Sequence, residues 1–410
     1  MSDMQDEPEP GPAGSALAGE DGPEAAATTP AARLADYVRG GGVIVPLLTV
    51  LMAFLAGGLV LVVTGHDPLS TYKAIFEGSG LDWLFPWTTG AARDTAAMNF
   101  QQTLLLATPL VLVGLAVAYA FRAGLFNIGG QGQYLVGSFA AVWVGSSFAD
   151  MPGLLHILLA VGAACLAGAV WAGIAGVLRA TVGANEVIST IMLNWIAVWV
   201  GVYLFGLGGP LQSDTQRSVP VSNDVVEAAH LPVFWGDPEL QGLHVGFFVV
   251  LAVLLVFWVV LNRSTTGYEV RATGFNPEAA RYAGIDVPRT YVKVMATCGV
   301  LAGLAGSLDV LGWQFRIATN DVTGSQIGFL GIAVALLGRN TAAGTALAAV
   351  LFGALVNGTS QRNLDPSIFE PELAFNLTII IQGLVVLAVS ADVLVVAMLR
   401  RGRRLLGSSP

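Results

Sequence analysis

Charged residues are scarce in this sequence. They make up 11% of its 410 residues, whereas a soluble globular protein carries about 25%. Hydrophobic residues make up 54%. A chain with so few charges has too little polar surface to cover a compact fold in water, so most of it is expected to face lipid or other apolar helices. The scarcity excludes an ordinary soluble domain and predicts an integral membrane protein.

Cysteine, histidine and lysine are also rare, and each shortage excludes a class of site. Cys165 and Cys298 lie within apolar stretches, and the four histidines show no ligand spacing, which argues against a disulfide framework or a metal centre. Only Lys73 and Lys293 occur, and neither follows a glycine, so the chain lacks a GxxxxGK[ST] phosphate loop. We expect no enzymatic activity and no metal or other cofactor bound by this chain.

Long apolar runs are abundant instead. A membrane-spanning helix needs about 20 apolar residues. With the N-terminus in the cytoplasm, all but five of the 19 Lys and Arg residues fall on the inner side, as the positive-inside rule requires. The predicted fold class is an all-α polytopic membrane protein of about ten transmembrane helices, with both termini cytoplasmic. The eighth span is short and interrupted by glycine, so we expect a broken or re-entrant helix there. The predicted spans are 43–64, 103–121, 131–149, 153–178, 186–206, 243–261, 291–312, 324–338, 341–361 and 373–398.

Three regions divide the chain. Residues 1–36 are expected to form a disordered acidic cytoplasmic tail, because they are rich in Pro, Ala and Gly and the first 32 residues hold no Lys or Arg. The transmembrane domain covers 43–398, and a basic cytoplasmic tail follows at 399–410. The longest connections are two outer loops and one inner loop, at 65–102, 207–242 and 262–290 respectively.

A short motif occurs twice, in opposite orientations. Residues 128–132 open the third span and residues 327–331 open the eighth, and both read IGxxG. The predicted topology sends these two spans in opposite directions, which is the arrangement of transporters built from inverted repeats around a midplane site. The alternative is chance similarity in a glycine-rich sequence.

The inner loop contains a short segment with helix start and stop signals. Asn276 is a suitable cap, Pro277 suits the first helical position, and Glu278 complements the positive end of the helix dipole. Gly284 suits a left-handed stop, after which Pro288 is expected to prevent the helix from resuming. So short a helix is marginal alone. It rests either on its own chain or on a second protein.

These residues carry a family resemblance. Glu278-Ala279-Ala280, followed after three residues by Gly284, resembles the EAA–Gly loop of ABC importer permeases. Further segments that agree are 121–133, 183–197 and 328–340, and together they are similar to the larger permease of nucleoside ABC importers, within the sugar and branched-chain amino-acid type. The resemblance covers about 43–398. It implies a coupling helix that docks on an ATPase subunit through Asn276, Pro277, Glu278, Ala279, Ala280, Arg281 and Gly284.

The resemblance also implies partners. A separate ABC ATPase subunit would bind ATP and Mg, a second homologous permease would complete the pore, and an extracytoplasmic substrate-binding lipoprotein would dock on the two outer loops. The chain would lie in lipid, in the cytoplasmic membrane, and no nucleic acid polymer is implied. Two positions depart from the family pattern, because relatives commonly carry an acid where Gln131 and Leu330 stand. A substrate role carried over to these two positions is therefore in doubt.

Polar residues in the spans are candidates for the substrate pathway. Amide side chains both donate and accept, which suits neutral, hydroxyl-rich solutes, and an aromatic ring can stack on a base. The alternative is hydrogen bonding between helices, or for Glu186 an ion pair with Arg179. Asp309 either accepts from ribose hydroxyls or pairs with Arg316. The candidates are Asn127, Gln131, Gln133, Asn185, Glu186, Asn194, Gln326, Phe329 and Asn376.

Together these observations predict a permease subunit that moves a small polar solute, best interpreted as a nucleoside, by alternating access. Three alternatives stay open at this point. The solute is a ribose-like simple sugar; the chain is an ion-coupled secondary transporter that works alone; or it is a membrane scaffold that transports nothing.

Overall fold

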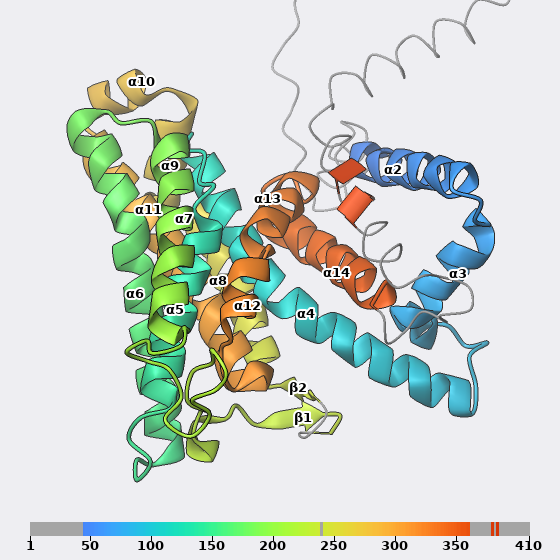
Figure 1. The fold of residues 1–410 in the computed structure, drawn as a ribbon. Helices are drawn as coiled ribbons and strands as arrows, with labels where there is room; N and C mark the ends of the chain where they lie inside the picture. The colour runs from blue at the N-terminus through green and yellow to red at the C-terminus, as the bar shows by residue number, and fades with distance from the viewer. Residues whose placement is uncertain (1–43, 238–240, 361–378, 381–382, 385–410) are drawn as a thin grey trace, which may run out of the picture. The chain divides into compact units, whose positions relative to one another are not determined.

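The computed structural model describes residues 44–237, 241–360, 379–380 and 383–384 (Figure 1). The chain divides into two compact units, Met1–Val45 and Pro46–Pro410, and almost all described residues belong to the second. The tenth predicted span, both predicted tails and Asn376 lie outside the described residues, apart from four helical positions within that span. The principal helices are α2 (Ile44–Val63), α3 (Pro68–Gly78), α4 (Ala91–Arg122), α5 (Gly130–Gly145), α6 (Gly153–Val182), α7 (Glu186–Phe205), α8 (Gly246–Arg263), α9 (Thr265–Phe275), α10 (Pro277–Tyr282), α11 (Val287–Asp309), α12 (Thr319–Gly324), α13 (Ile327–Leu337) and α14 (Ala342–Gly358).

Each of the first nine predicted spans coincides with a helix. Six stretches of the described chain are long and apolar enough to cross a membrane: α4, α6, α7, α8, α11 with the turn that follows it, and α12 with α13. The helices α2 and α14 contribute shorter apolar stretches. The prediction of an α-helical polytopic membrane protein is confirmed.

The eighth span is broken, as the sequence suggested. The short helix α12 ends at Gly324, and α13 begins at Ile327. Between them Ser325 is extended, with ψ 131°. The interruption exposes polar backbone and side chains inside the bundle, which membrane proteins tolerate where the chain is buried in protein or lines a cavity.

Several boundaries differ from the sequence prediction. The helix α4 begins at Ala91, well before residue 103, and contains Pro109. Residues Leu243–His244 form strand β2, which pairs antiparallel with β1 (Val233–Trp235), rather than the start of a span. The expectation that Pro288 prevents a helix is wrong: α11 begins at Val287, and Pro288 lies in its first turn, where its missing N–H costs nothing.

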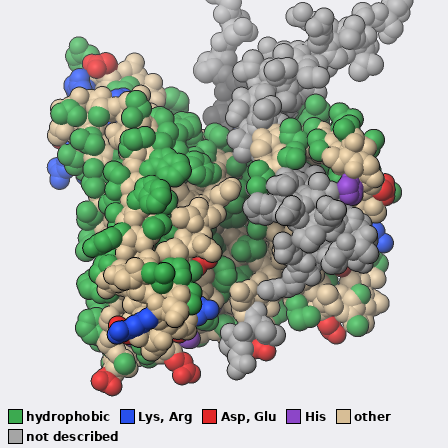
Figure 2. All heavy atoms as spheres, in the orientation of Figure 1, with side chains coloured by type: hydrophobic (Ala, Val, Ile, Leu, Met, Phe, Trp, Pro, Cys, Tyr) green, Lys and Arg blue, Asp and Glu red, His purple; other side chains and the backbone are tan. Residues whose placement is uncertain are grey.

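Glycines allow close contact between helices at the centre of the bundle. The helices α4 and α11 are largely buried, whereas α6, α7 and α8 leave most of their residues uncovered. A methyl group on Gly299 or Gly303 of α11 would overlap the backbone of α6, so these helices touch main chain to main chain, as small residues permit in membranes. Figure 2 shows hydrophobic side chains over the face formed by α6 and α7, with charged side chains mostly at its two ends.

Candidate functional site

The loop 262–290 forms the capped helix that the sequence predicts. Asn276 Oδ1 accepts from the backbone N–H groups of Glu278 (3.0 Å) and Ala279 (3.1 Å) at the start of α10. Gly284 takes the left-handed conformation, φ +84°, and the Ile285 N–H donates to the Ala280 carbonyl at 3.0 Å. Both ends of α10 therefore have the hydrogen bonds that a helix of six residues needs.

Most side chains on and beside α10 are exposed. Ala280 is the one residue of α10 that is buried. On either side of the helix Phe275 is 88% exposed and Tyr282 is 93% exposed, and Glu278 pairs with Arg281 at 3.3 Å in an exposed position. The helix lies at one end of the bundle beside α9 (Figure 1). Large aromatic side chains so fully exposed beside a charged pair are typical of a surface that a partner covers.

The base of this loop contacts the end of α4. A methyl group on Gly274, at the end of α9, would overlap the Arg122 carbonyl at the end of α4. The Arg122 guanidinium in turn donates to the Asn340 carbonyl, from Nε at 3.1 Å and from Nη2 at 3.0 Å. The end of α9 before α10, the end of α4 and the turn between α13 and α14 are therefore in direct contact.

The two IGxxG motifs lie against each other. The Gly328 N–H donates to Gln131 Oε1 at 2.8 Å, and a methyl group on Gly328 would overlap the Gln131 backbone. Gly130 lies beside Gly328 as well. The start of α5 thus meets the start of α13, and the two repeated elements meet at their glycines.

Four of the predicted pathway residues form a polar cluster behind this contact, which we call the motif cluster: Asn127, Gln131, Gln133 and Asn194. All four are buried. Asn127 and Gln133 exchange hydrogen bonds through their amides at 3.0 and 3.2 Å. Asn194 accepts from the Gly132 N–H at 2.8 Å and donates to the Ile128 carbonyl at 2.9 Å. Only Gln131 Nε2 lacks a partner among the described residues of this cluster.

The remaining predicted pathway residues are scattered. Asn185 caps α7 by accepting from Val187 N–H at 2.9 Å. Glu186 pairs with Arg179 at 3.5 Å. Phe329 is 54% exposed on the outside of α13. Of these residues only Gln326 lines a cavity that is bordered by residues of six helices. For all these residues a contact with substrate stays a prediction.

That cavity has a volume of about 410 Å³ and lies among α4, α5, α11, α12, α13 and α14. Asp309, only 4% exposed, is held at its edge by two donors: Tyr134 Oη donates to Oδ2 at 2.6 Å, and Trp313 Nε1 donates to Oδ1 at 3.0 Å. Ligand pockets commonly have volumes of about 300–1,000 Å³ and combine apolar walls with a few fixed polar groups. The lining residues are Leu106, Pro109, Leu110, Tyr134, Asp309, Trp313, Gln314, Asn320, Asp321, Gly324, Ser325, Gln326, Ile327, Leu330 and Val356.

A break in helix geometry shapes this edge of the cavity. After Asp309 the chain makes a π-helical turn, Val310–Gln314, and Phe315 is left-handed at φ +55°. Turns of this type are frequent at functional sites. Here the turn delivers Trp313 and Gln314 to the cavity lining.

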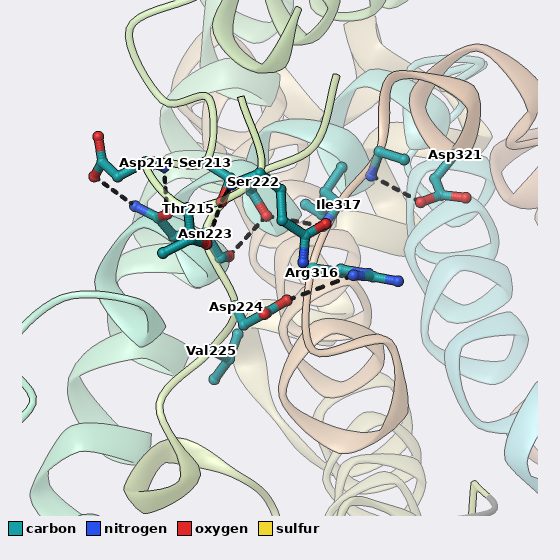
Figure 3. Close-up of polar contacts among 12 residues, drawn as sticks. Ser213, Asp214, Thr215, Ser222, Asn223, Asp224, Val225, Arg316, Ile317 and Asp321 are labelled. Carbon is teal, nitrogen blue, oxygen red and sulfur yellow. Dashed lines mark hydrogen bonds and ion pairs between the residues drawn. The ribbon is translucent and has the colours of Figure 1, made fainter. Parts of the chain in front are cut away.

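Residues of the loop 207–242 bind the segment that follows the π-helical turn (Figure 3). The Ser222 N–H donates to the Ile317 carbonyl at 2.9 Å, and the Ile317 N–H donates to Ser222 Oγ at 3.0 Å. Arg316 pairs with Asp224 at 4.0 Å. The suggested pairing of Arg316 with Asp309 is therefore wrong, because Asp309 already accepts from Tyr134 and Trp313. The contacts with the loop hold the residues after the π-helical turn in place.

His244 is buried behind the same turn. Its Nδ1 accepts from the Gly246 N–H at 3.1 Å, and its ring lies so close to Gly312 that a methyl group there would overlap it. Burial lowers the pKa of His244 from 6.5 to about 4. The imidazole is therefore neutral at physiological pH and serves as a structural acceptor.

Comparison with known proteins gives the family. A family model described as "branched-chain amino acid transport system / permease component" matches residues 99–390. The chain belongs to this family of permeases. It is accordingly a multi-pass membrane protein and a transport subunit. No solved structure matches it.

Three relatives are similar over most of their length. The guanosine ABC transporter permease of Bacillus subtilis (strain 168) is 37% identical over 341 residues, 82% of this chain and 91% of the relative. A nucleoside ABC transporter permease of Lactococcus lactis subsp. cremoris is 33% identical over 77% of this chain and 83% of its own length. A glucose ABC transporter permease of Haloferax volcanii is 36% identical over 83% of this chain and 85% of its own.

Sequence reasoning found some cavity residues and missed others. It named Gln326 and Asp309. It did not connect Tyr134, Trp313, Asp321 or the neighbouring Asn320 and Ser325 with a site. The usable signal was the cluster of polar residues at 320–326 inside an apolar segment, next to the glycine that breaks it.

Proposed function

We propose that the chain is the permease subunit of an ABC importer that moves nucleosides inward across the cytoplasmic membrane. The observation that carries this proposal is its similarity to the guanosine and nucleoside permeases over more than three quarters of the chain. The cavity beside Asp309 supports it, because it offers acceptors for hydroxyl and N–H groups next to an apolar lining.

A separate ATPase subunit supplies the energy and binds ATP and Mg, and this chain binds no cofactor of its own. The capped helix α10 is the docking element. Its support is that both helix ends are satisfied within the loop while Phe275 and Tyr282 are almost fully exposed. The contact of Gly274 with the end of α4 then carries a movement of α10 into the spans.

Two further partners complete the importer. A second homologous permease packs beside this chain, which fits the uncovered apolar faces of α6, α7 and α8. A substrate-binding lipoprotein docks on the outer loops 65–102 and 207–242, the second of which is clamped to the edge of the cavity. Both termini lie in the cytoplasm.

Co-purification tests the assembly. The chain, expressed with its genomic neighbours and extracted in mild detergent, should retain an ABC ATPase. In that complex Glu278→Ala and Gly284→Val should abolish solute-stimulated ATP hydrolysis, with Asp150→Asn, a change at an exposed position in a short outer loop, as the matched control. Retention of full stimulation in both α10 variants would contradict the docking role.

The glucose permease relative favours a second candidate, a simple sugar as solute. Competition separates the two. Uptake of labelled guanosine by cells that express the importer should be reduced by excess unlabelled nucleoside and unaffected by glucose or ribose. The reverse order of competition would assign the importer to sugars.

A further inference from the structure

The aliphatic and the polar residues that line the cavity come from different parts of the chain. Its aliphatic residues come from α4, α13 and α14: Leu106, Pro109, Leu110, Ile327, Leu330 and Val356. Its polar residues come from one continuous stretch between the end of α11 and the start of α13: Asp309, Gln314, Asn320, Asp321, Ser325 and Gln326. A solute that fills this space needs one part that tolerates hydrocarbon and another rich in hydrogen-bonding groups.

The lining contains two carboxyl groups, those of Asp309 and Asp321. Asp309 is fixed by Tyr134 and Trp313. Asp321 accepts from the Ala318 N–H through Oδ2 at 2.8 Å, which fixes its carboxylate at the start of α12. Among the described residues no Lys or Arg lines the cavity, and Arg316 nearby is paired with Asp224. Like charges repel, so a lining with two carboxylates and no Lys or Arg among the described residues disfavours an anion.

We propose that this cavity is a solute site that holds an uncharged nucleoside during transport and rejects its phosphorylated form. The proposal rests on the proposed function and adds to it the place of binding and the charge of the solute. The aliphatic residues of α4, α13 and α14 cover the faces of the base. Asp309 and Asp321 accept from ribose hydroxyl or base N–H groups. The same two carboxylates repel the negative charge of a phosphate, so the site selects the nucleoside by disfavouring its phosphorylated form.

Cysteine protection tests this site directly. Ser325→Cys places a thiol in the cavity lining, and Thr323→Cys places one on α12 outside it, which makes a matched control. The native thiols give a low background, since Cys298 is fully buried and Cys165 is half-buried. The probe is a charged methanethiosulfonate, applied to the complete importer in nanodiscs with guanosine or with guanosine monophosphate.

Guanosine at ten times its half-saturating concentration should slow labelling of Ser325→Cys by about tenfold, by simple occupancy. It should leave Thr323→Cys unchanged, and the monophosphate should protect neither. Equal protection by the monophosphate would overturn the charge selection. Absence of protection in a complex that still transports guanosine would overturn the site, whereas absence of guanosine transport by the unmodified complex would overturn the proposed function instead. If Ser325→Cys fails to assemble, Asn320→Cys tests the same lining.

Discussion

Two regions of this protein place polar side chains inside an apolar helix bundle, and they differ in what those side chains contact. In the motif cluster, Asn127, Gln133 and Asn194 are bonded to one another or to nearby backbone. At the cavity, Asp309 accepts from Tyr134 and Trp313, and it also lines the cavity together with its neighbours. The cost of placing polar groups in a membrane is therefore met in the first region by protein alone, and in the second by protein and, we infer, by the solute.

The comparison also shows why residue type alone misleads. Amides at the start of α5 look suitable for binding a hydroxyl-rich solute, but they satisfy the backbone where two glycine-rich helix starts meet. The residues that border the cavity come from the broken end of α11 and from α12. Of the four predictions that follow, the first three test this division. Changes in the motif cluster should reduce the stability of the fold, whereas changes at the cavity should reduce the transport of solute.

The largest effect is expected where the two helix starts touch. Gly328→Leu puts a side chain into the backbone of Gln131, and overpacking against main chain should cost about 3 kcal/mol or more. We expect loss of folded protein, measured as the disappearance of the monodisperse peak in fluorescence-detected size-exclusion chromatography. Gly324→Ala, at a position with open space for a methyl group, is the control. A normally assembled Gly328→Leu protein would show that the contact is not tight.

Asp309→Asn tests the cavity. The substitution preserves shape but removes a charged acceptor, and a hydrogen bond to a charged group is worth about 1.5–3 kcal/mol. Guanosine uptake should therefore fall by roughly tenfold to a hundredfold while the complex still assembles. Asp150→Asn should transport normally. Unchanged uptake by Asp309→Asn would remove this carboxylate from the solute path.

A pair of amide substitutions separates the two regions most clearly. Asn194→Leu leaves the Gly132 N–H and the Ile128 carbonyl without their partner, which should cost about 1–3 kcal/mol of stability without changing the KM for solute. Gln326→Ala should raise the KM and leave thermal stability unchanged, because the side chain borders the cavity. If Asn194→Leu raised the KM and Gln326→Ala lowered the stability, the distinction between a structural motif cluster and a solute-binding cavity would be wrong.

The smallest effect concerns pH at the turn behind the cavity. His244 titrates at about 4 in the folded chain and near 6.5 when unfolded. The unfolded chain therefore binds a proton first, so stability is fully present above pH 6.5 and declines as pH falls toward 4. At pH 5.5 the loss should be about 1.4 kcal/mol, seen as a lower melting temperature. In His244→Gln the part of the fall in melting temperature that His244 causes should disappear. If the variant and the unmodified protein showed the same dependence of melting temperature on pH, the effect would not come from His244.

Much of the fold was predictable because a membrane span is a continuous run of apolar residues. Runs of apolar residues gave the helices, and Asn276, Pro277 and Gly284 gave the ends of α10, since caps depend on neighbours only. The break expected in the eighth span lies at its start, directly after Gly324, whereas α13 continues unbroken through Gly328 and Gly331. The early start of α4 and the strand at Leu243–His244 were not predicted. The first lies where Gln101 and Gln102 of α4 contact the distant Gln241 carbonyl, and the second is a very short strand that is paired with β1.

The cavity was less predictable than the fold. Tyr134 and Asp309 are 175 positions apart, and no local pattern pairs them. The π-helical turn that delivers Trp313 leaves no clear mark in sequence. Conversely, Asn194 reads as a pathway residue until its two backbone partners are seen. The sequence locates polar residues in the membrane, but only three-dimensional packing separates a satisfied group from one that faces a cavity.

Uptake by proteoliposomes tests the central claim most directly. The purified chain should be reconstituted alone and with its ATPase, second permease and binding protein, and accumulation of labelled guanosine measured with ATP or with an imposed ion gradient. We expect accumulation only in the complete assembly and only with ATP. Accumulation by the chain alone, driven by an ion gradient, would contradict the account.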